Sequence, residues 1–503
     1  MAASSDLFEL IQALTPSEKR YFRSYAFRHV IGEENRYFQL FQAINAQDRY
    51  DESALLEQFE GAAFTRQFSV AKNYLTQLIL QSLREFHRGK NFNLRMREHL
   101  DHFELLFDKG LFRHCHKLLR KAEKLARSRE AFSYLYELKV LQKRLVKRED
   151  PVRSRKLLPE LSLEEAHWLD QARLQSELRR IHDQVFALVA RVGLIRSDAQ
   201  REELAGILTQ VTVSSAEEVE GFETRIIYHY IYAYAARLQG KVDKVLERYQ
   251  AMVNLWEAHP QWQAEFPERY IRTLIANLDT HLQAGEYDQF ENAIDKVRAV
   301  EVKSLPLQAQ VFYFTHVLEL RYFLNTRDLA RARTRMTEVK TGFATFEPHL
   351  GPDLQIILAY NLACLYFLSG IPGESLQWTN HILNQSSGSV RRDILRGARM
   401  LDLCNHYSRG NFDYIESLHQ STLRFLKLDP GDHRFETSLV KGIWRVSKQA
   451  EPELGTLHQE LTALLRDPAE EVLGGEEVLL WLEALEKGVP LAEHYQSQSA
   501  STK

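Results

Sequence analysis

The sequence predicts an all-α fold, in which an α-solenoid of helix pairs follows an N-terminal helical block. Three observations support this prediction. The 503-residue chain has only 13 prolines and 22 glycines, which is few for an all-β chain of this length. Its long periodic segments repeat apolar residues with the 3.6-residue period of a helix. The second half of the chain also repeats a pattern of helix, tight turn and helix.

Composition and charge exclude several classes of protein. The net charge is −3, so the chain as a whole lacks the basic balance that favours nucleic acid or anionic membranes. Its three scattered cysteines indicate free thiols in a reducing compartment rather than a disulfide framework. The first residues have no basic stretch before an apolar run, and no apolar run approaches the ~18 residues of a membrane span. We therefore expect a soluble, cytoplasmic protein. The cysteines are Cys115, Cys364 and Cys404.

Residues 1–90 are expected to form the N-terminal helical block. In TPSEKRYF, Thr15 is a helix cap, Pro16 occupies the first turn and Glu18 stands at the capping-box position. Further helices are expected in NRYFQLFQAINAQ, DESALLEQFEG and SVAKNYLTQLILQSLREFH. Together, SEKRYFRSYA, DESALLEQF and KNYLTQLILQSLREFH resemble the N-terminal region of a group of uncharacterised bacterial helical-repeat proteins. That resemblance covers about 90 residues and implies no activity.

Residues 91–213 are expected to form a basic helical region. It contains one faint helix pair at 102–126 that turns at Gly110, and a helix near 132–148. The prolines of EDPVRSRKLLPELS predict a linker, after which a long helix runs from 163 to about 191. Ser162 and Glu165 stand at capping-box spacing before that helix.

The stretch RIIYHYIYAYAARLQG, residues 225–240, presents tyrosines at every second position, as a half-buried strand would. The segment continues without a turn signal from Ser215 to Gln239, which is too long for a usual strand. Ser215 and Glu218 have capping-box spacing, the alanines favour helix, and Gly240 suits the end of a helix. We therefore predict a helix with aromatic side chains on more than one face. The tyrosines are Tyr228, Tyr230, Tyr232 and Tyr234.

Residues 214–430 are expected to form the repeat array. Five helix pairs turn at a glycine or asparagine that tolerates the left-handed conformation, with spacings of 45, 40, 45 and 40 residues. The turn residues are Gly240, Gly285, Asn325, Gly370 and Gly410. Residues 431–490 are expected to be a helical cap, and 491–503 a disordered tail.

The repeats resemble the tetratricopeptide family. The residues of AYNLACLYFLSGIPGESLQWTNHIL that fall at its signature positions are Leu362, Ala363, Tyr366, Gly370, Ser375 and Ile382. The period of 40–45 residues exceeds the family's 34, and Val245, Phe290 and Ile415 replace the small residue of the second helix. The resemblance implies stacked helix pairs with an extended concave binding surface.

The sequence contains none of the common catalytic motifs. It has no phosphate-cradling glycine loop, no G-x-S-x-G elbow, no H-E-x-x-H and no C-x-x-C. We therefore expect no enzyme activity and no cofactor.

The densest group of metal-ligand residue types flanks Gly110. His99 and His102 can share a helix face, whereas successive residues 114–116 point in divergent directions. A zinc site would need ligands from across the hairpin. We expect solvated or hydrogen-bonded histidines and no metal. The group comprises His99, His102, His114, Cys115 and His116.

Two basic features could bind anions. Residues 66–156 hold 23 Lys and Arg against 10 Asp and Glu, a net charge of +13. This stretch could contact nucleic acid, with Lys72, Asn73 and Gln77 exposed on a helix-turn-helix, although the turn is long for that motif. Alternatively it is a solvated face that attracts acidic parts of the chain or of a partner. The second feature is a stripe of Arg392, Arg396 and Arg399, which could hold a carboxylate or phosphate.

The leading hypothesis is a non-enzymatic scaffold or adaptor that binds a protein or peptide in the groove of the repeat array. Aromatic residues and arginine are the usual anchors of such interfaces. The alternative is a regulator, in which the basic N-terminal part binds nucleic acid while the repeats sense a partner. The residues expected to line the groove are Tyr230, Tyr234, Arg237, Phe312, Glu319, Tyr322, Tyr360, Phe367 and Tyr407.

Overall fold

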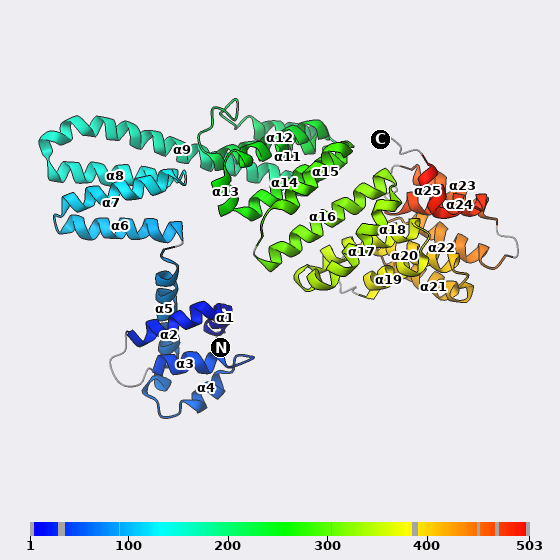
Figure 1. The fold of residues 1–503 in the computed structure, drawn as a ribbon, viewed down its shortest axis with the longest axis horizontal. Coiled ribbons are helices and arrows are strands. Elements are labelled where there is room, and N and C mark those ends of the chain that lie inside the picture. The colour runs from blue at the N-terminus through cyan, green and yellow to red at the C-terminus, as the bar shows by residue number, and fades with distance from the viewer. Residues whose placement is uncertain are drawn as a thin grey trace. The chain divides into compact units, whose positions relative to one another are not determined.

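The fold was analysed in a computed structural model of the chain. The structure describes residues 5–28, 36–89, 91–302, 304–384, 391–429, 431–449, 453–467 and 472–498. Within these ranges there are 25 α-helices, two short 3-10 helices and no strand (Figure 1). The all-α prediction is therefore confirmed. The chain divides into two compact units, Met1–Glu177 and Leu178–Lys503, which are described separately.

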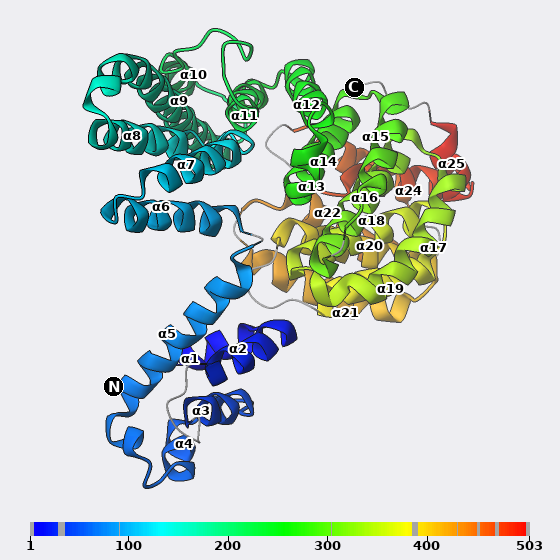
Figure 2. The same ribbon diagram turned by 60° about the vertical axis from the view of Figure 1, so that its left-hand side comes forward.

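The first unit begins with a block built on one long helix. Its helices are α1 (Asp6–Ala13), α2 (Pro16–Arg28), α3 (Arg36–Asn45), α4 (Glu52–Gln58) and α5 (Phe68–His87). Figure 2 shows α2 and α3 against the long α5, where Phe22, Leu40 and Ile79 are buried in a common core. The predicted capping box is present: the Thr15 backbone N–H donates to Glu18 at 2.7 Å, and the Glu18 N–H donates to Thr15 Oγ1 at 3.3 Å.

The remainder of the first unit is a stack of long helices. They are α6 (Phe92–Asp108), α7 (Phe112–Arg127), α8 (Phe132–Glu149) and the first part of α9 (Pro151–Val192), which continues into the second unit. Gly110 forms the predicted turn between α6 and α7, with φ of 69°.

The predicted linker at 149–162 is wrong, because α9 runs through it without interruption. Pro151 starts the helix at a position where its missing N–H is not needed, and Asp150 accepts a hydrogen bond from the Val152 N–H at 3.0 Å. Ion pairs Lys139–Glu164 and Lys143–Glu165 then hold α9 against α8.

The second unit contains the helix pairs. Its helices are α10 (Asp198–Leu208), α11 (Phe222–Leu238), α12 (Val242–Glu257), α13 (Pro260–Glu265), α14 (Pro267–Ala284), α15 (Tyr287–Ala299), α16 (Leu305–Thr326), α17 (Leu329–Phe346), α18 (Pro352–Leu368), α19 (Pro372–Asn384), α20 (Arg392–Ser408), α21 (Phe412–Leu428), α22 (Arg434–Val446), α23 (Leu454–Leu465), α24 (Gly475–Lys487) and α25 (Leu491–Ser497). The first helices of successive pairs, α14, α16, α18, α20 and α22, contact one another in order. We call these helices, together with α11, the first-helix layer.

Four of the five predicted turns are in place. Gly240, Gly285, Gly370 and Gly410 all have φ between 68° and 73°. The prediction at Asn325 is wrong, because α16 continues through Thr326 and the left-handed residue is Arg327, with φ of 59°. The Arg327 side chain donates to the Tyr495 carbonyl at 3.3 Å and lies over its ring, which stabilises this unusual conformation for a non-glycine residue.

The tyrosine-rich segment is the helix α11, but it starts later than predicted. Instead of capping a helix, Glu218 accepts from the Ser214 N–H at 3.0 Å within a turn. Gly221, with φ of 91°, then redirects the chain, and the helix begins at Phe222.

The C-terminal prediction is partly wrong. Residues 431–490 contain α22, α23 and α24, as expected for a helical cap. Residues 491–497 form α25 rather than a disordered tail, because Tyr495 is buried in the core and donates from its hydroxyl to the Leu324 carbonyl. Residues 499–503 lie outside the described part of the chain. No helix in the described ranges combines the length and the apolar character that a membrane crossing requires.

We predict that Gly370→Val and Gly410→Val each destabilise the second unit by about 1 kcal/mol or more, through the left-handed backbone alone. A Cβ at either glycine would meet no atom within 4 Å, so no clash contributes. Urea unfolding measures the effect. Gly206→Val is the matched control, since Gly206 is equally open but has no positive φ. An equal loss at Gly206 would contradict the assignment of the turns.

Candidate partner-binding groove

The helix α11 carries tyrosines on several faces because it packs on several sides. Tyr228 is buried and donates to the Ser214 carbonyl at 3.2 Å. Tyr230 Oη lies 3.3 Å from Thr273 Oγ1 of α14. Tyr234 lies beside Tyr230 on the same face and packs against Phe186 of α9, with ring centroids 5.9 Å apart, and burial raises the pKa of Tyr234. These tyrosines therefore join α11 to its neighbours, and only part of their surface remains for a partner.

Five of the residues predicted to line the groove are buried, each less than a tenth exposed. These five are Phe312, Glu319, Tyr322, Tyr360 and Phe367. Their surface is too small for a partner to bind, so we correct their role to packing. Sequence reasoning placed them on the open side because it had no information about which side of each helix faces its neighbours.

The contacts of three of these residues show what buries them. The Phe312 ring packs so closely on Gly342 of α17 that a Cβ at that glycine would overlap it. Tyr322 stacks on Phe290 of α15, with centroids 4.8 Å apart and planes 4° from parallel. Glu319 is paired with Arg298 and Arg335, at 2.7 and 3.0 Å. All three therefore join the first helices to the second helices.

The chain's own C-terminal helices cover the remaining predicted aromatic residues. Helix α24 contacts α18 and α20, and α25 contacts α18 (Figure 1). Trp481 of α24 lies with its ring centroid 6.3 Å from Phe367 and 5.6 Å from Tyr407. The Tyr360 hydroxyl lies against Gly474, just before α24. This part of the first-helix layer is therefore occupied from within the chain.

An open apolar cavity of about 470 Å³ lies in the earlier part of the first-helix layer, between α14 and α16. Ile275, Phe314 and Val317 contribute to its apolar lining. Tyr313 also lines it, and burial raises the pKa of that hydroxyl to about 12, so it stays neutral. None of these residues was predicted, because an Ile, a Phe and a Val on an apolar helix carry no signal that separates cavity from core.

Two ion pairs lie at the rim of this cavity. Arg321 of α16 reaches Asp279 of α14 at 3.0 Å, and Arg272 pairs with Glu268 one turn earlier on α14, also at 3.0 Å. All four residues line the cavity. The rim therefore carries both signs of charge around an apolar centre.

A second cavity, of about 660 Å³, adjoins the first, and Ala276 and Asp279 line both. It lies between the end of α9, α11, α12 and α14, and Leu194, half exposed, contributes to its lining. Arg237, predicted as the anchor of the groove, lines this cavity and is exposed, as is Arg196. Neither guanidinium forms an ion pair with any residue that the structure describes. We call the two adjoining cavities the α14 groove.

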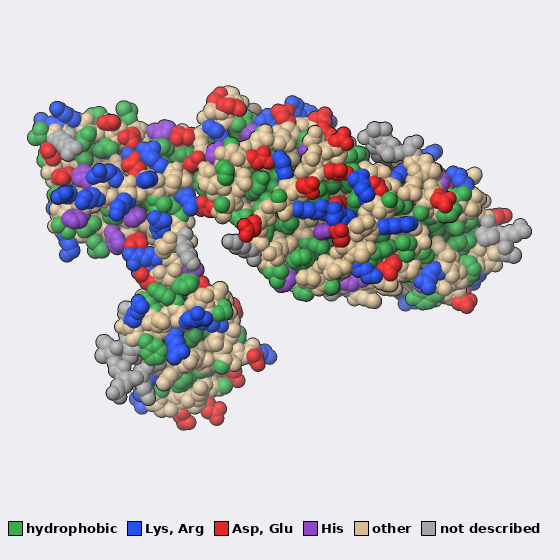
Figure 3. Space-filling view, viewed as in Figure 1, with side chains coloured by type: hydrophobic (Ala, Val, Ile, Leu, Met, Phe, Trp, Pro, Cys, Tyr) green, Lys and Arg blue, Asp and Glu red, His purple; other side chains and the backbone are tan. Residues whose placement is uncertain are grey.

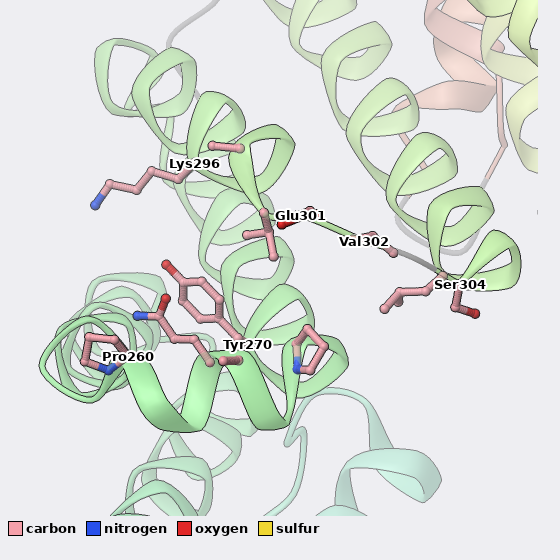
Figure 4. Close-up of a pocket in the computed structure, with 12 residues that line it drawn as sticks. Pro260, Tyr270, Lys296, Glu301, Val302 and Ser304 are labelled. Atoms are coloured by element: carbon pink, nitrogen blue, oxygen red, sulfur yellow. The ribbon is translucent and has the colours of Figure 1, made fainter.

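A third cavity, of about 770 Å³, adjoins the first through Leu307, which lines both. Figure 4 shows Tyr270 of α14 and Lys296 of α15 on one side, with Val302 and Ser304 of the connection to α16 on the other. Lys296 is already paired with Glu257 at 2.8 Å. The lining offers no unpaired cation and no grouping of catalytic side chains, so we assign no chemistry to it.

The predicted basic stripe on α20 is occupied by the chain's own carboxylates. Asp429 accepts from Arg392 at 2.7 Å and from Arg396 at 2.5 Å, and Arg396 also binds Glu436 at 3.0 Å. Arg399 lies over the Phe425 ring, 4.6 Å from its centroid. The stripe does bind carboxylates, as its spacing indicated, but these belong to α22 and the segment before it.

The histidine group near Gly110 does not converge on a site. Cys115 is fully buried, and burial raises the pKa of its thiol. His116 is paired with Glu149, and burial lowers the pKa of His99. In the described ranges, no three His, Cys, Asp or Glu side chains are grouped as a metal site.

Of the three residues predicted to be exposed on a helix-turn-helix, one is not available for nucleic acid. Lys72 is bound by Glu52 of α4 and lies near the Tyr50 ring, so it is not free to contact nucleic acid. Asn73 and Gln77 are exposed on α5, as predicted.

Comparison with known proteins identifies no relative of the chain. No family model, no curated protein and no solved structure matches the chain.

Proposed function

We propose that the protein is a non-enzymatic scaffold that binds a segment of a partner protein in the α14 groove. The observation that carries this proposal is the open apolar cavity between α14 and α16, which adjoins two exposed guanidiniums without ion-pair partners among the described residues. Apolar cavities with a few placed polar groups are the usual form of binding sites.

The groove favours a segment with two features. The cavity at Ile275, Phe314 and Val317 suits a large apolar side chain, which gains most from removal from water. Arg196 and Arg237 suit an acidic group nearby, because guanidinium binds carboxylate with two parallel hydrogen bonds. The rim ion pairs are exposed and contribute orientation more than affinity.

The proposal is tested by selecting from a random peptide library on the full-length protein. We expect enrichment of peptides that combine a large apolar residue with Asp or Glu. The affinities of the selected peptides are then measured by fluorescence anisotropy on the wild-type chain and on three variants.

Arg237→Glu should weaken the selected peptides at least tenfold, because it places like charge beside their acidic group. Ala276→Gln should do the same sterically, since Ala276 is half-buried where the two cavities meet and its side chain can extend into the groove. Arg424→Glu is the control, because Arg424 is equally exposed but lies on α21, outside the groove. The proposed groove would be contradicted if the peptides bound Arg237→Glu and Ala276→Gln with the same affinity as the wild-type chain. It would also be contradicted if the selection enriched no peptide.

A further inference from the structure

Helix α7 of the first unit carries an unusual concentration of positive charge. Its sequence, FRHCHKLLRKAEKLAR, holds six Lys and Arg and a single acid, Glu123. All six cations are exposed, and the five that form no ion pair within the described ranges make up a surface that we call the α7 ridge. The ridge consists of Arg113, Lys117, Arg120, Lys121 and Lys124.

The packing of α7 directs the ridge outward. Its apolar residues Cys115, Leu119, Ala122 and Ala126 are buried in the core of the first unit. The cations lie on the opposite face, and Arg113 and Lys124 at its two ends are eleven residues apart, so the row is about 17 Å long. Figure 3 shows Lys and Arg side chains gathered in the region of α7 and α8.

The acid on α7 does not neutralise the ridge. Glu123 accepts hydrogen bonds from Arg127, from Lys139 at 3.0 Å and from Gln142 at 2.9 Å. Burial raises the pKa of Glu123, but these hydrogen bonds outweigh it and lower the pKa, so the carboxylate is ionised and its charge is directed toward α8.

The ridge differs in this respect from the middle of the adjacent helix α8. On α8, Lys139, Lys143 and Arg144 are all paired, with Glu123, Glu165 and Glu104 respectively. The five ridge cations, in contrast, form no ion pair with any residue in the described ranges. The row of charge on α7 is therefore available, whereas these three cations of α8 are neutralised.

We propose that the α7 ridge binds the phosphate backbone of a nucleic acid without sequence preference. A straight row of cations matches a polymer with regularly repeated negative charge. The ridge contains no aromatic side chain, so it offers no aromatic platform for stacking bases. An acidic peptide would depend on apolar contacts for affinity, and the ridge has no cavity to supply them. An anionic membrane would be contacted only by charge, because the apolar face of α7 is in the core.

The test measures binding of random-sequence duplex DNA to the full chain by fluorescence anisotropy over a range of NaCl concentrations. Each cation that contacts a phosphate contributes about 0.9 to the slope of log affinity against log salt. The variant Lys117→Glu/Lys121→Glu/Lys124→Glu should reduce that slope by about 3 and weaken binding at least tenfold at low salt. The fold should persist, because the reversal relieves like-charge repulsion in a stretch with a net charge of +13.

The matched control is Lys427→Glu/Lys441→Glu/Arg445→Glu, which makes the same change in net charge at exposed positions of the second unit. It should bind DNA as wild type does. Equal loss in the two triple variants would assign the effect to net charge and overturn the ridge. The proposal that the ridge binds nucleic acid would be overturned if the wild-type protein did not bind the duplex. It would also be overturned if the wild-type protein bound polyglutamate with equal affinity. Arg237→Glu should leave DNA binding unchanged. The DNA-binding proposal and the peptide-groove proposal can therefore be contradicted independently of each other.

Discussion

Replacing Trp481 by alanine is expected to lower the free energy of unfolding of the second unit by about 3–5 kcal/mol, the usual loss for a fully buried tryptophan. The Trp481 side chain is 2% exposed, packs on Phe367 and Tyr407, and donates from Nε1 to Ser408 Oγ at 2.9 Å. Truncation removes the contacts between α24 and two helices of the first-helix layer, and leaves a cavity that the adjacent rings fill only in part.

Trp444→Ala is the matched control, because it removes the same side chain from a half-buried position on α22. Its loss should be clearly smaller. Hydrogen exchange of the full-length protein shows which helices the substitution destabilises. Amides in α18, α20 and α24 should lose protection in Trp481→Ala, while the protection of amides in α6 to α8 should not change. Similar effects of the two substitutions would show that α24 is not anchored as the structure indicates.

The position of α24 and α25 also explains why part of the sequence-based groove prediction was wrong. The repeat pattern identified Phe367 and Tyr407 as aromatic residues on the first helices, which is where the structure places them. That these surfaces are covered depends on a contact between segments about 75–115 residues apart, such as Trp481 with Phe367. Local pattern contains no information about such a contact, so these aromatic residues were predicted to line an open groove.

Backbone features were predicted where one residue determines them. Gly240, Gly285, Gly370 and Gly410 lie at left-handed turns because glycine adopts positive φ without strain. The turn at Arg327 was missed for the opposite reason, since tertiary contacts with Tyr495 hold a residue that has no intrinsic preference for this conformation.

The residues that line the α14 groove were predicted only in part. Arg237 was identified because arginine is a usual anchor of interfaces, and it lines the α14 groove. Phe314 and Val317 were missed because an apolar residue at a cavity and one in a core look the same in sequence. Arg392 and Arg396 of α20 were found, but Asp429 and Glu436, which bind them, are 33–40 residues further along the chain.

Asp429→Asn is expected to destabilise the second unit by about 3–5 kcal/mol at pH 7, because it breaks a buried ion-pair network. The Asp429 side chain is 1% exposed, and it binds Arg392 and Arg396, with His433 Nε2 at 3.3 Å. Asparagine preserves the size but removes the charge, so Arg396, only 16% exposed, loses a carboxylate in a place with little water. Glu416→Gln is the control, since its pair with Lys448 is half exposed on both sides and should contribute at most about 1 kcal/mol.

The pH dependence of this difference separates charge from packing. Burial raises the pKa of Asp429, but the two arginines outweigh it and hold the pKa below its ordinary value of about 3.9. The stabilisation is therefore complete above about pH 5 and is lost as pH falls through the lower pKa of the folded state. Urea unfolding at pH 7 and pH 3 should show a smaller gap between wild type and Asp429→Asn at pH 3, whereas a gap due to packing would not change. If Asp429→Asn were as stable as wild type at pH 7, Arg392 and Arg396 would not depend on Asp429, and the α20 stripe would again be a candidate site for a partner's carboxylate.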